Sequence, residues 1–341
     1  MLRLGKLDND DLERLVLQKF RRVRPESLSS PTIGQDCALL DLSGDLVVLS
    51  CDPITSASVT HLGRLTVHVS CNDAAAAGAE PVGLLVTLLM PPSGSMEQIA
   101  QIADDLSNAA QLANVDILGG HTEVTNAVTR AVTSATVVAR QPKDAALRGM
   151  RPGDAIVLTK WAAIEGTTIL AEDFASRLSV LPESTLAAAR AMAGQLSIVP
   201  ESRIAMRFGA SAMHDVTEGG VLGAAWELGY ANACAVTIDT GAIPVREETK
   251  NICAALSLDP LRLIGSGSLL IACEDGARLV SALIAHGIPA AVIGQAIDGG
   301  QSFADEIPLE EPHADELYRL TAGESSTAVD LNACVNSFRM L

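Results

Sequence analysis

The chain is poor in aromatic residues and in positive charge. Only 3% of its 341 residues are Phe, Trp or Tyr, whereas 48% are hydrophobic, so we expect an aliphatic core of Ala, Val, Leu and Ile. The 24 basic residues against 41 acidic ones give a net charge of −17. Nucleic acids and anionic membranes bind clustered Lys and Arg, so this balance argues against both as partners. Nucleotide binding stays open, because a divalent cation can join carboxylates to phosphates.

Long apolar runs and paired cysteines are also missing. The longest apolar run, residues 82–92, is about half of what a membrane-spanning helix requires. The N-terminal residues show no apolar signal core. The seven cysteines are an odd number with no Cys-x-x-Cys. These features predict a cytoplasmic protein with reduced cysteines and no membrane partner.

Several familiar catalytic motifs are absent from the sequence. No Gly-x-x-x-x-Gly-Lys-Ser/Thr occurs, which excludes a standard P-loop, and no Gly-x-Gly-x-x-Gly opens a helix after a strand. The Gly-x-Ser-x-Gly nucleophile elbow is absent, and the histidines are too dispersed for a zinc signature. Any nucleotide site must therefore be built from other residues.

Length and patterning predict two α/β domains. A chain of this length exceeds the usual single core, and a polar connector begins at Gln141, so we place the domains at residues 1–145 and 146–341. Helices and strands mix without strict alternation, which favours mixed or antiparallel sheets over a doubly wound parallel one. In the first half we expect helices over 8–20, 61–78 and 95–113, and strands over 46–50, 82–90, 115–118 and 130–140. In the second half we expect strands over 155–159, 235–238, 268–273 and 290–293, and helices over 165–177, 184–192, 202–209, 219–229, 247–256, 276–286 and 314–320.

Four short polar segments of the first half, at least two of them directly after an apolar run, are the candidate functional turns. They are Gly34-Gln35-Asp36, Cys51-Asp52-Pro53, Cys71-Asn72-Asp73 and Gly119-Gly120-His121-Thr122-Glu123. Magnesium prefers oxygen ligands at about 2.1 Å and keeps waters, so one or two carboxylates plus phosphates suffice for each ion. Each aspartate alone is equally consistent with ending a strand or capping a helix. The three in this order favour magnesium holding a polyphosphate.

The second half adds a weaker set of candidates. We expect a turn at His214-Asp215, followed by Gly219 and Gly220 where a helix begins. Free N–H groups there are suited to a phosphate, but Thr217 as an ordinary N-cap with closely packed glycines is an equal alternative. Lys160, just after a strand, is a candidate phosphate contact, although an exposed lysine is the commoner explanation. His121 is either a proton donor or a hydrogen-bonded turn residue.

The motifs occur in an order that resembles one known superfamily. They are Gly34-x-Asp36-Cys37-Ala38, Asp52-Pro53, Asn72-Asp73 followed by Gly78-Ala79-x-Pro81, Gly119-Gly120-x-Thr122, and Asp215-Val216-Thr217-x-Gly219-Gly220. The chain resembles, from about residue 7 to about residue 296, the superfamily of aminoimidazole ribonucleotide (AIR) synthetase, thiamine-monophosphate kinase, selenophosphate synthetase and the hydrogenase-maturation protein HypE. HypE-like and AIR synthetase-related proteins are the most similar members.

The resemblance implies a fold and a chemistry. An N-terminal α/β domain forms a barrel-like dimer core and a C-terminal α/β sandwich domain completes the cleft. ATP and Mg²⁺ bind near the dimer interface, and ATP phosphorylates an acceptor or activates an oxygen before dehydration. By matching motifs, the metal carboxylates are Asp36, Asp52 and Asp73, and Asp52, Asp73 and His121 are the candidate catalytic residues. The matching nucleotide contacts are Asn72, Gly119, Gly120, Thr122, Asp215, Gly219 and Gly220, with Lys160 added as a candidate.

Three departures from the family pattern limit what is implied. Gln35 stands where many relatives carry a first aspartate, and His121 stands where they carry Asp or Glu, so the number of metal ions is open. The Pro-Arg-x-Cys tail of HypE proteins is absent: the nearest thiol, Cys334, is not terminal. No thiol precedes Cys37, unlike in selenophosphate synthetases.

Two functions therefore stay open at this point. One is a magnesium- and ATP-dependent enzyme acting on an unknown small molecule, as a homodimer. The other is a non-catalytic, nucleotide-binding dimer that serves a maturation pathway as a partner protein. The intact set of carboxylates favours the enzyme.

Overall fold

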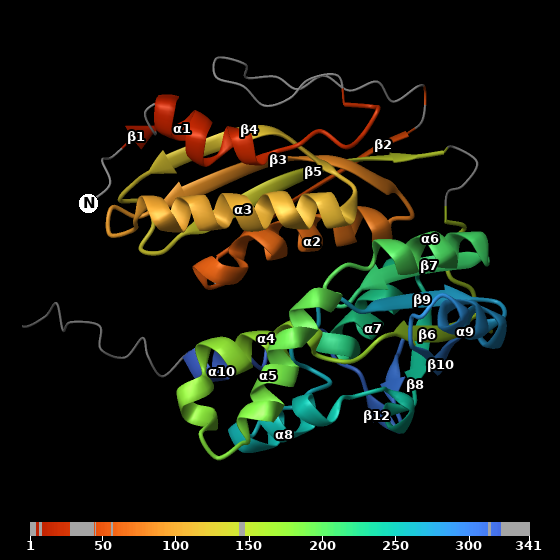
Figure 1. Ribbon diagram of the computed structural model, residues 1–341. Coiled ribbons are helices and arrows are strands. Elements are labelled where there is room, and N and C mark those ends of the chain that lie inside the picture. Colours follow the sequence, from red (N-terminus) through yellow and green to blue (C-terminus); the bar gives the residue numbers. More distant parts are fainter. Residues whose placement is uncertain are drawn as a thin grey trace, which may run out of the picture.

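The computed structural model describes residues 5–6, 9–27, 44, 46–55, 57–142, 147–312 and 315–321. Figure 1 shows two α/β halves, one above the other. The upper, N-terminal half comprises β1 (Gly5–Lys6), α1 (Asn9–Leu15), η1 (Leu17–Lys19), β2 (Leu46–Ile54), α2 (Val59–Ala76), β3 (Glu80–Met90), α3 (Met96–Ala113), β4 (Asp116–Val124) and β5 (Val132–Gln141). The lower half comprises β6 (Ala155–Thr159), α4 (Ile164–Asp173), η2 (Ala175–Leu178), α5 (Glu183–Ala191), η3 (Met192–Gln195), α6 (Val199–Arg207), β7 (Ala210–Asp215), α7 (Gly220–Ala231), β8 (Ala235–Ile238), η4 (Thr240–Ala242), α8 (Glu247–Leu256), β9 (Leu269–Cys273), α9 (Gly276–Ala285), β10 (Ala290–Ile297), β11 (Phe303–Ala304), β12 (Ile307–Pro308) and α10 (Tyr318–Thr321).

Each half is built around a mixed sheet. The N-terminal sheet has the order β1-β4-β3-β5-β2, with β3 and β4 parallel and the other pairs antiparallel. The C-terminal sheet has the order β12-β11-β8-β10-β6-β9-β7, in which β8 and β11 form the parallel pair. The predicted α/β fold class with mixed sheets is confirmed.

Helix α2 lies between the N-terminal sheet and the C-terminal half (Figure 1). It packs closely on α3 because Gly63 leaves room: a Cβ at this position would lie 2.5 Å from the backbone nitrogen of Leu106. The helix ends at Ala76, and Gly78 follows it as the expected stop: its φ is +77° and its N–H donates to the carbonyl of Ala75 at 2.9 Å. Asn72 and Asp73 are therefore fixed in the last turns of a helix and do not belong to a turn.

The two halves share one hydrophobic core. Leu62 and Val67 of α2 belong to the same buried cluster as Ile204, Met213 and Ile271 of the C-terminal half. By contrast, the sheet face opposite α2 leaves apolar side chains in solvent: Val47 is 52% exposed and Leu49 is 62% exposed. None of the described helices combines the length and apolar character of a membrane span.

Three expected turns are strands in the structure. Strand β2 continues through Asp52 and Pro53 to Ile54, which is possible because β2 is an edge strand and loses no ladder bond to the proline. Gly119 and Gly120 lie within β4. His214 and Asp215 end β7, a strand that the pattern did not predict.

Candidate active site

Two of the predicted aspartates meet where β2 passes the last turns of α2. The carboxyl groups of Asp52 on β2 and Asp73 on α2 are close enough for Asp52 to act on the pKa of Asp73. The hydroxyl of Ser50, on the same face of β2 as Asp52, donates to Asp73 Oδ2 at 2.5 Å. Burial, followed by the contact with Asp52, raises the pKa of Asp73 to about 8.

A third carboxylate faces this pair from the C-terminal half. Asp215 at the end of β7 is 7% exposed, and its Oδ2 has no hydrogen-bond partner among the described residues. Burial raises the pKa of Asp215, and the charge of Asp52 adds to the effect. The charge of Asp215 in turn raises the pKa of Asp73. Acidic side chains from β2 and β7 are thus close enough to Asp73 on α2 to oppose its ionisation.

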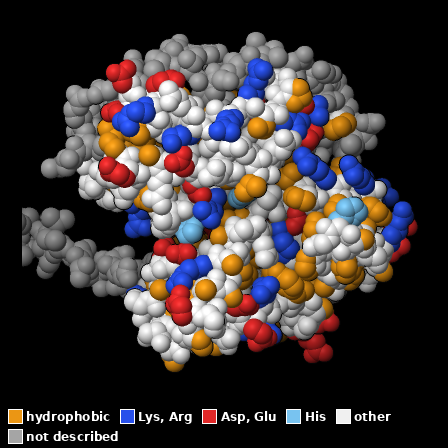
Figure 2. All heavy atoms as spheres, in the orientation of Figure 1, with side chains coloured by type: hydrophobic (Ala, Val, Ile, Leu, Met, Phe, Trp, Pro, Cys, Tyr) orange, Lys and Arg blue, Asp and Glu red, His pale blue; other side chains and the backbone are white. Residues whose placement is uncertain are grey.

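An open cleft of about 440 Å³ lies beside these groups. Its lining includes Asp73 and Ala77 from the N-terminal half and Met213, His214 and Asp215 from β7. His214 Nδ1 lies 2.7 Å from the backbone oxygen of Asp215, and its Nε2 lies 3.6 Å from Glu227 Oε2 on α7. Figure 2 shows acidic, basic and histidine side chains along the seam where the two halves meet.

This geometry fits a cation better than it fits three free carboxylates. Burial, and after it the neighbouring negative charge, raises the pKa values of Asp73 and Asp215, and a bound cation would offset that charge. Among the described residues, no three His, Cys, Asp or Glu side chains already surround one metal position. Magnesium needs only one or two protein carboxylates when waters and phosphates complete its octahedron, so the pair Asp52 and Asp73 is a sufficient anchor.

His121 does not join the acid cluster within one chain. The strand registers align Asp52 with Ala135, Ala135 with Val86, and Val86 with Gly120, so these four positions share one sheet face. His121, the next residue, faces the opposite side, where its Nε2 lies 3.4 Å from Glu123 Oε2.

The glycines of β4 have a packing role. A Cβ on Gly120 would lie 1.7 Å from the backbone oxygen of Val86, so only glycine lets β4 approach β3 here. Gly119, with φ at +157°, lies at an irregularity in the same register, opposite Leu85. Gly120 and Thr122 alternate with His121 and therefore share the sheet face of Asp52.

Lys160 and Asn72 are fully engaged within the protein. Lys160 is 7% exposed, and its Nζ donates to the carbonyls of Gln195 at 2.9 Å and Ser197 at 2.7 Å and pairs with Glu201 at 2.6 Å. Burial lowers the pKa of Lys160. Both expectations for Lys160, a phosphate contact and an exposed lysine, are therefore corrected: its three donors are used inside the protein. Both ends of the Asn72 amide likewise bond to backbone of the C-terminal half.

The N-terminus of α7 already holds an internal carboxylate. Asp315, 2% exposed, accepts a hydrogen bond from the N–H of Gly219 at 2.8 Å. Gly219 adopts φ +83°, and a Cβ on Gly220 would lie 2.5 Å from the backbone oxygen of Leu261. The structure therefore favours close packing for this glycine pair, but the N-cap of α7 is Gly219 and not Thr217 as that alternative expected. The predicted metal ligand Asp36, and Cys334, lie outside the described residues.

Comparison with known proteins gives the family. Residues 34–140 match the model of the AIR synthase related protein N-terminal domain, and residues 151–305 match the model of its C-terminal domain. The chain belongs to the AIR synthase related family. A carbamoyl dehydratase HypE of Cupriavidus necator is 30% identical over 252 residues, which cover 71% of this chain and 69% of the relative.

Solved structures show the same fold at lower identity. E. coli HypE, a hydrogenase maturation protein, is 24% identical with a TM-score of 0.76 and covers 91% of this chain and 98% of its own. HypE in complex with ATP is 23% identical with a TM-score of 0.75 over 90% and 95%. Thiamine-monophosphate kinase from Stenotrophomonas maltophilia is 20% identical with a TM-score of 0.70 over 83% and 92%. The expected AIR synthase related superfamily, HypE-like, is confirmed, and with it an enzyme of the ATP-dependent kinase, synthetase and dehydratase group whose reaction stays open.

In this AIR synthase related protein, sequence reasoning missed Ser50, His214 and Glu227 as neighbours of the site. Ser50 had a usable signal, because residues two apart on a strand share a face and Asp52 was already a candidate. Glu227 had none, since only the packing of α7 against β7 brings it to His214.

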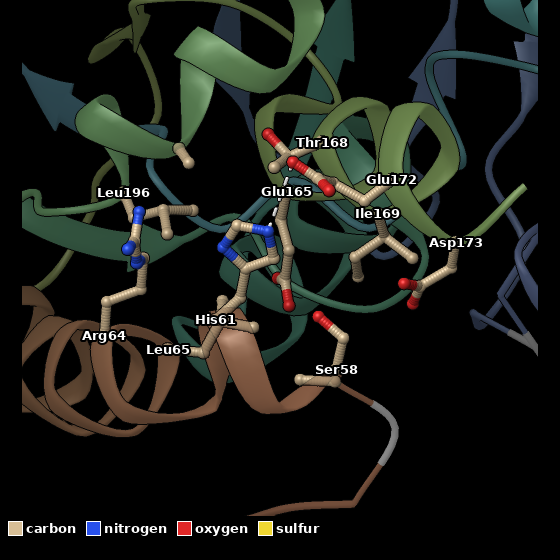
Figure 3. A pocket seen from close by; sticks show the side chains of 12 residues that line it. Ser58, His61, Arg64, Leu65, Glu165, Thr168, Ile169, Glu172, Asp173 and Leu196 are labelled. Atoms are coloured by element: carbon tan, nitrogen blue, oxygen red, sulfur yellow. Dashed lines mark ion pairs between the residues drawn. The ribbon is translucent and has the colours of Figure 1, made fainter. Parts of the chain in front are cut away.

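A second hollow lies at the other end of α2 (Figure 3). It is lined by Ser58, His61 and Leu65 from the region of α2 and by Glu165 and Glu172 from α4. Its volume of about 10 Å³ has room for roughly one water molecule. Glu165 Oε2 has no hydrogen-bond partner among the described residues, and burial raises the pKa of Glu165 to about 7. This cavity is too small for a nucleotide, so the open cleft is the candidate active site.

Proposed function

We propose that this protein is a Mg²⁺-dependent enzyme that uses ATP to phosphorylate a small metabolite or to drive its dehydration. The observation that carries the proposal is the convergence of Asp52, Asp73 and Asp215 beside an open cleft. Family membership and the ATP complex of a protein of the same fold support it. The specific acceptor and its reaction are left open.

Asp52 and Asp73 are proposed as the protein ligands of Mg²⁺, with Asp36 as a third ligand from outside the described residues. Both described carboxylates reach one place from different elements, as a bridge between metal and phosphate requires. Bound magnesium would neutralise the charge that develops on the phosphates. Asp215 faces the same place with an unpartnered oxygen, and we propose that it orients the nucleotide through that metal or its waters.

The remaining nucleotide contacts are proposed with different support. Gly120 and Thr122 lie on the sheet face that carries Asp52, and Gly119 precedes them. Gly219 and Gly220 shape the loop after Asp215. The N–H of Gly219 already donates to Asp315, and the backbone of Leu261 occupies the space beside Gly220. We assign no step at the acid cluster of the same chain to His121, because it lies on the opposite sheet face.

We also propose a cytoplasmic homodimer. The exposed apolar side chains Val47, Leu49 and Leu85 on the sheet face away from α2 would be covered by a second copy in a barrel-like core. The five described cysteines are free thiols, which agrees with a reducing compartment.

Calorimetric titration with a non-hydrolysable ATP analogue, with and without Mg²⁺, tests the proposal. We expect magnesium-dependent binding in the wild type that Asp73→Asn abolishes and Glu165→Gln leaves within about twofold, because Glu165 lies at the other cavity. Absence of analogue binding under both conditions would defeat the proposal. Binding without any ATP turnover, whatever small molecules are supplied, would instead indicate the non-catalytic partner protein; HypE itself has been solved with HypF.

A further inference from the structure

A single buried amide joins the two halves of the molecule next to the candidate site. Asn72, 0% exposed, donates from Nδ2 to the carbonyl of Leu196 at 2.9 Å. Its Oδ1 accepts from the N–H of Ile198 at 3.0 Å. Both bonds connect α2 of the N-terminal half to the loop between η3 and α6 of the C-terminal half.

The same loop is held from its other side by Lys160. The ammonium group donates to the carbonyls of Gln195 and Ser197. Along residues 195–198, the hydrogen bonds to Lys160 therefore alternate with those to Asn72. Trp161 Nε1 adds a bond to the side chain of Gln195 at 3.0 Å. A loop whose backbone groups are fixed one after another cannot shift without breaking several buried hydrogen bonds, each of which is costly to leave unmade.

This loop leads directly to Asp215. Ile198 precedes α6, and α6 is followed within three residues by β7, which ends at Asp215. A neighbouring bond reinforces the connection, since Ser202 on α6 donates from Oγ to the carbonyl of Ala75 at 2.6 Å. Asp73 therefore lies in α2 between two residues, Asn72 and Ala75, that are bonded to the loop and the helix preceding the strand that carries Asp215.

We infer that Asn72 is a positioning residue that sets the spacing between Asp73 and Asp215 across the cleft. The inference rests on the proposed function of these two aspartates and replaces direct nucleotide contact by Asn72. Lys160 serves as the second support of the loop. Without the amide, the loop before α6 is held less tightly to α2, and the spacing between the carboxylates of Asp73 and Asp215 is less well defined.

A double-mutant cycle in the kcat of magnesium-dependent ATP hydrolysis tests this inference. We expect Asn72→Ala to lower kcat roughly tenfold or more with KM for ATP within about threefold, as misplacement of a catalytic group does. In an Asp215→Asn background the same change should have no further effect, because Asn72 acts through Asp215. Additive losses, or a kcat within about twofold of wild type, would overturn the inference.

Thr66→Val is the matched control. Thr66 is 0% exposed on the same helix, and its hydroxyl bonds to Leu62 and Thr133 of its own half. We expect a similar loss of thermal stability and an unchanged kcat. Ser202→Ala, which removes one neighbouring bond across the seam, covers the case in which Asn72→Ala does not fold, and should lower kcat in the same direction by a smaller factor.

The distance between the halves gives a readout that needs no activity. Spin-labelled unnatural amino acids at the exposed positions Leu112 and Val180 report it by double electron–electron resonance. We expect Asn72→Ala to broaden or shift the distance distribution and Thr66→Val to leave it unchanged. If the wild type turns over no ATP, whatever small molecules are supplied, the proposed function fails and this measurement alone decides: identical distributions for Asn72→Ala and wild type refute the inference.

Discussion

A carboxyl group with a raised pKa lies near each end of helix α2, one beside an open cleft and the other in a small cavity. At the C-terminal end, Asp73 faces Asp52 and Asp215 beside a cleft of about 440 Å³. At the N-terminal end, Glu165 of α4 faces His61 across a cavity of about 10 Å³. Burial raises the pKa at both places, to about 8 for Asp73 and about 7 for Glu165.

The difference shows that a perturbed pKa alone does not identify a ligand site. Glu165 has a raised pKa chiefly because it is buried, and the hydrogen bonds from Ser266 oppose the shift. Asp73 is also buried in part, but in addition it lies near the carboxylates of two other elements and lines a cleft large enough for a ligand. The open cleft and the presence of three neighbouring aspartates distinguish the candidate active site from Glu165, a single carboxyl group buried where the two halves meet.

The largest expected effect comes from Asp215→Asn. Removal of one charge that faces the metal and phosphates should lower magnesium-dependent ATP turnover roughly 100-fold. Glu165→Gln, the matched isosteric change in the small cavity, should alter turnover by less than about twofold. Steady-state assays of both variants measure the contrast, and equal losses would erase the distinction between the two sites.

A smaller effect links magnesium to pH. Because the folded pKa of Asp73 is raised, protonation of this group stabilises the fold below its unfolded pKa, and this stability falls as pH rises toward about 8. Magnesium should replace the proton, so the thermal shift on adding Mg²⁺ should grow from pH 6 to pH 8.5. Saturation at 100 times Kd would add about 2.7 kcal/mol. Differential scanning fluorimetry across pH measures it; Asp73→Asn should lose the shift, and a shift that is greatest at pH 6 would contradict the linkage.

The smallest effect concerns Glu165 itself. With a folded pKa of about 7 against 4.5, Glu165 contributes stability below pH 4.5 that is lost as pH rises to 7. Glu165→Gln should therefore flatten that part of the stability profile and gain about 1 kcal/mol at pH 8, less than the full linkage because the amide also lacks partners. Urea denaturation at pH 5 and pH 8 checks this, and a parallel profile for both proteins would refute it.

Much of the fold follows from local patterns. The expected strands 155–159 and 235–238 and the helix 247–256 match the structure residue for residue. The helix expected over 95–113 begins at Met96 with Ser95 as its N-cap, in a capping box with Gln98. These elements were predictable because propensity, periodicity and caps agree within a short stretch of chain.

The errors arise where distant residues decide the outcome. β2 continues past Asp52 because it is an edge strand, and sheet order is not a local property. Gly120 is needed within β4 because the backbone oxygen of Val86 leaves no room for a Cβ there. Lys160 is buried because its ammonium group donates hydrogen bonds to carbonyls 35 and 37 residues further along the chain. At the site, the sequence was sufficient to propose that Asp52 and Asp73 meet, but not to place His121 on the opposite sheet face.

The shared core has a consequence for how the molecule loses its structure. Leu62 and Val67 of α2 pack in one cluster with Ile204, Met213 and Ile271, so removal of either half exposes apolar surface of the other. Truncation at the connector would leave the inner side of α2 bare and prone to aggregate. We therefore expect the two halves to unfold in one cooperative transition.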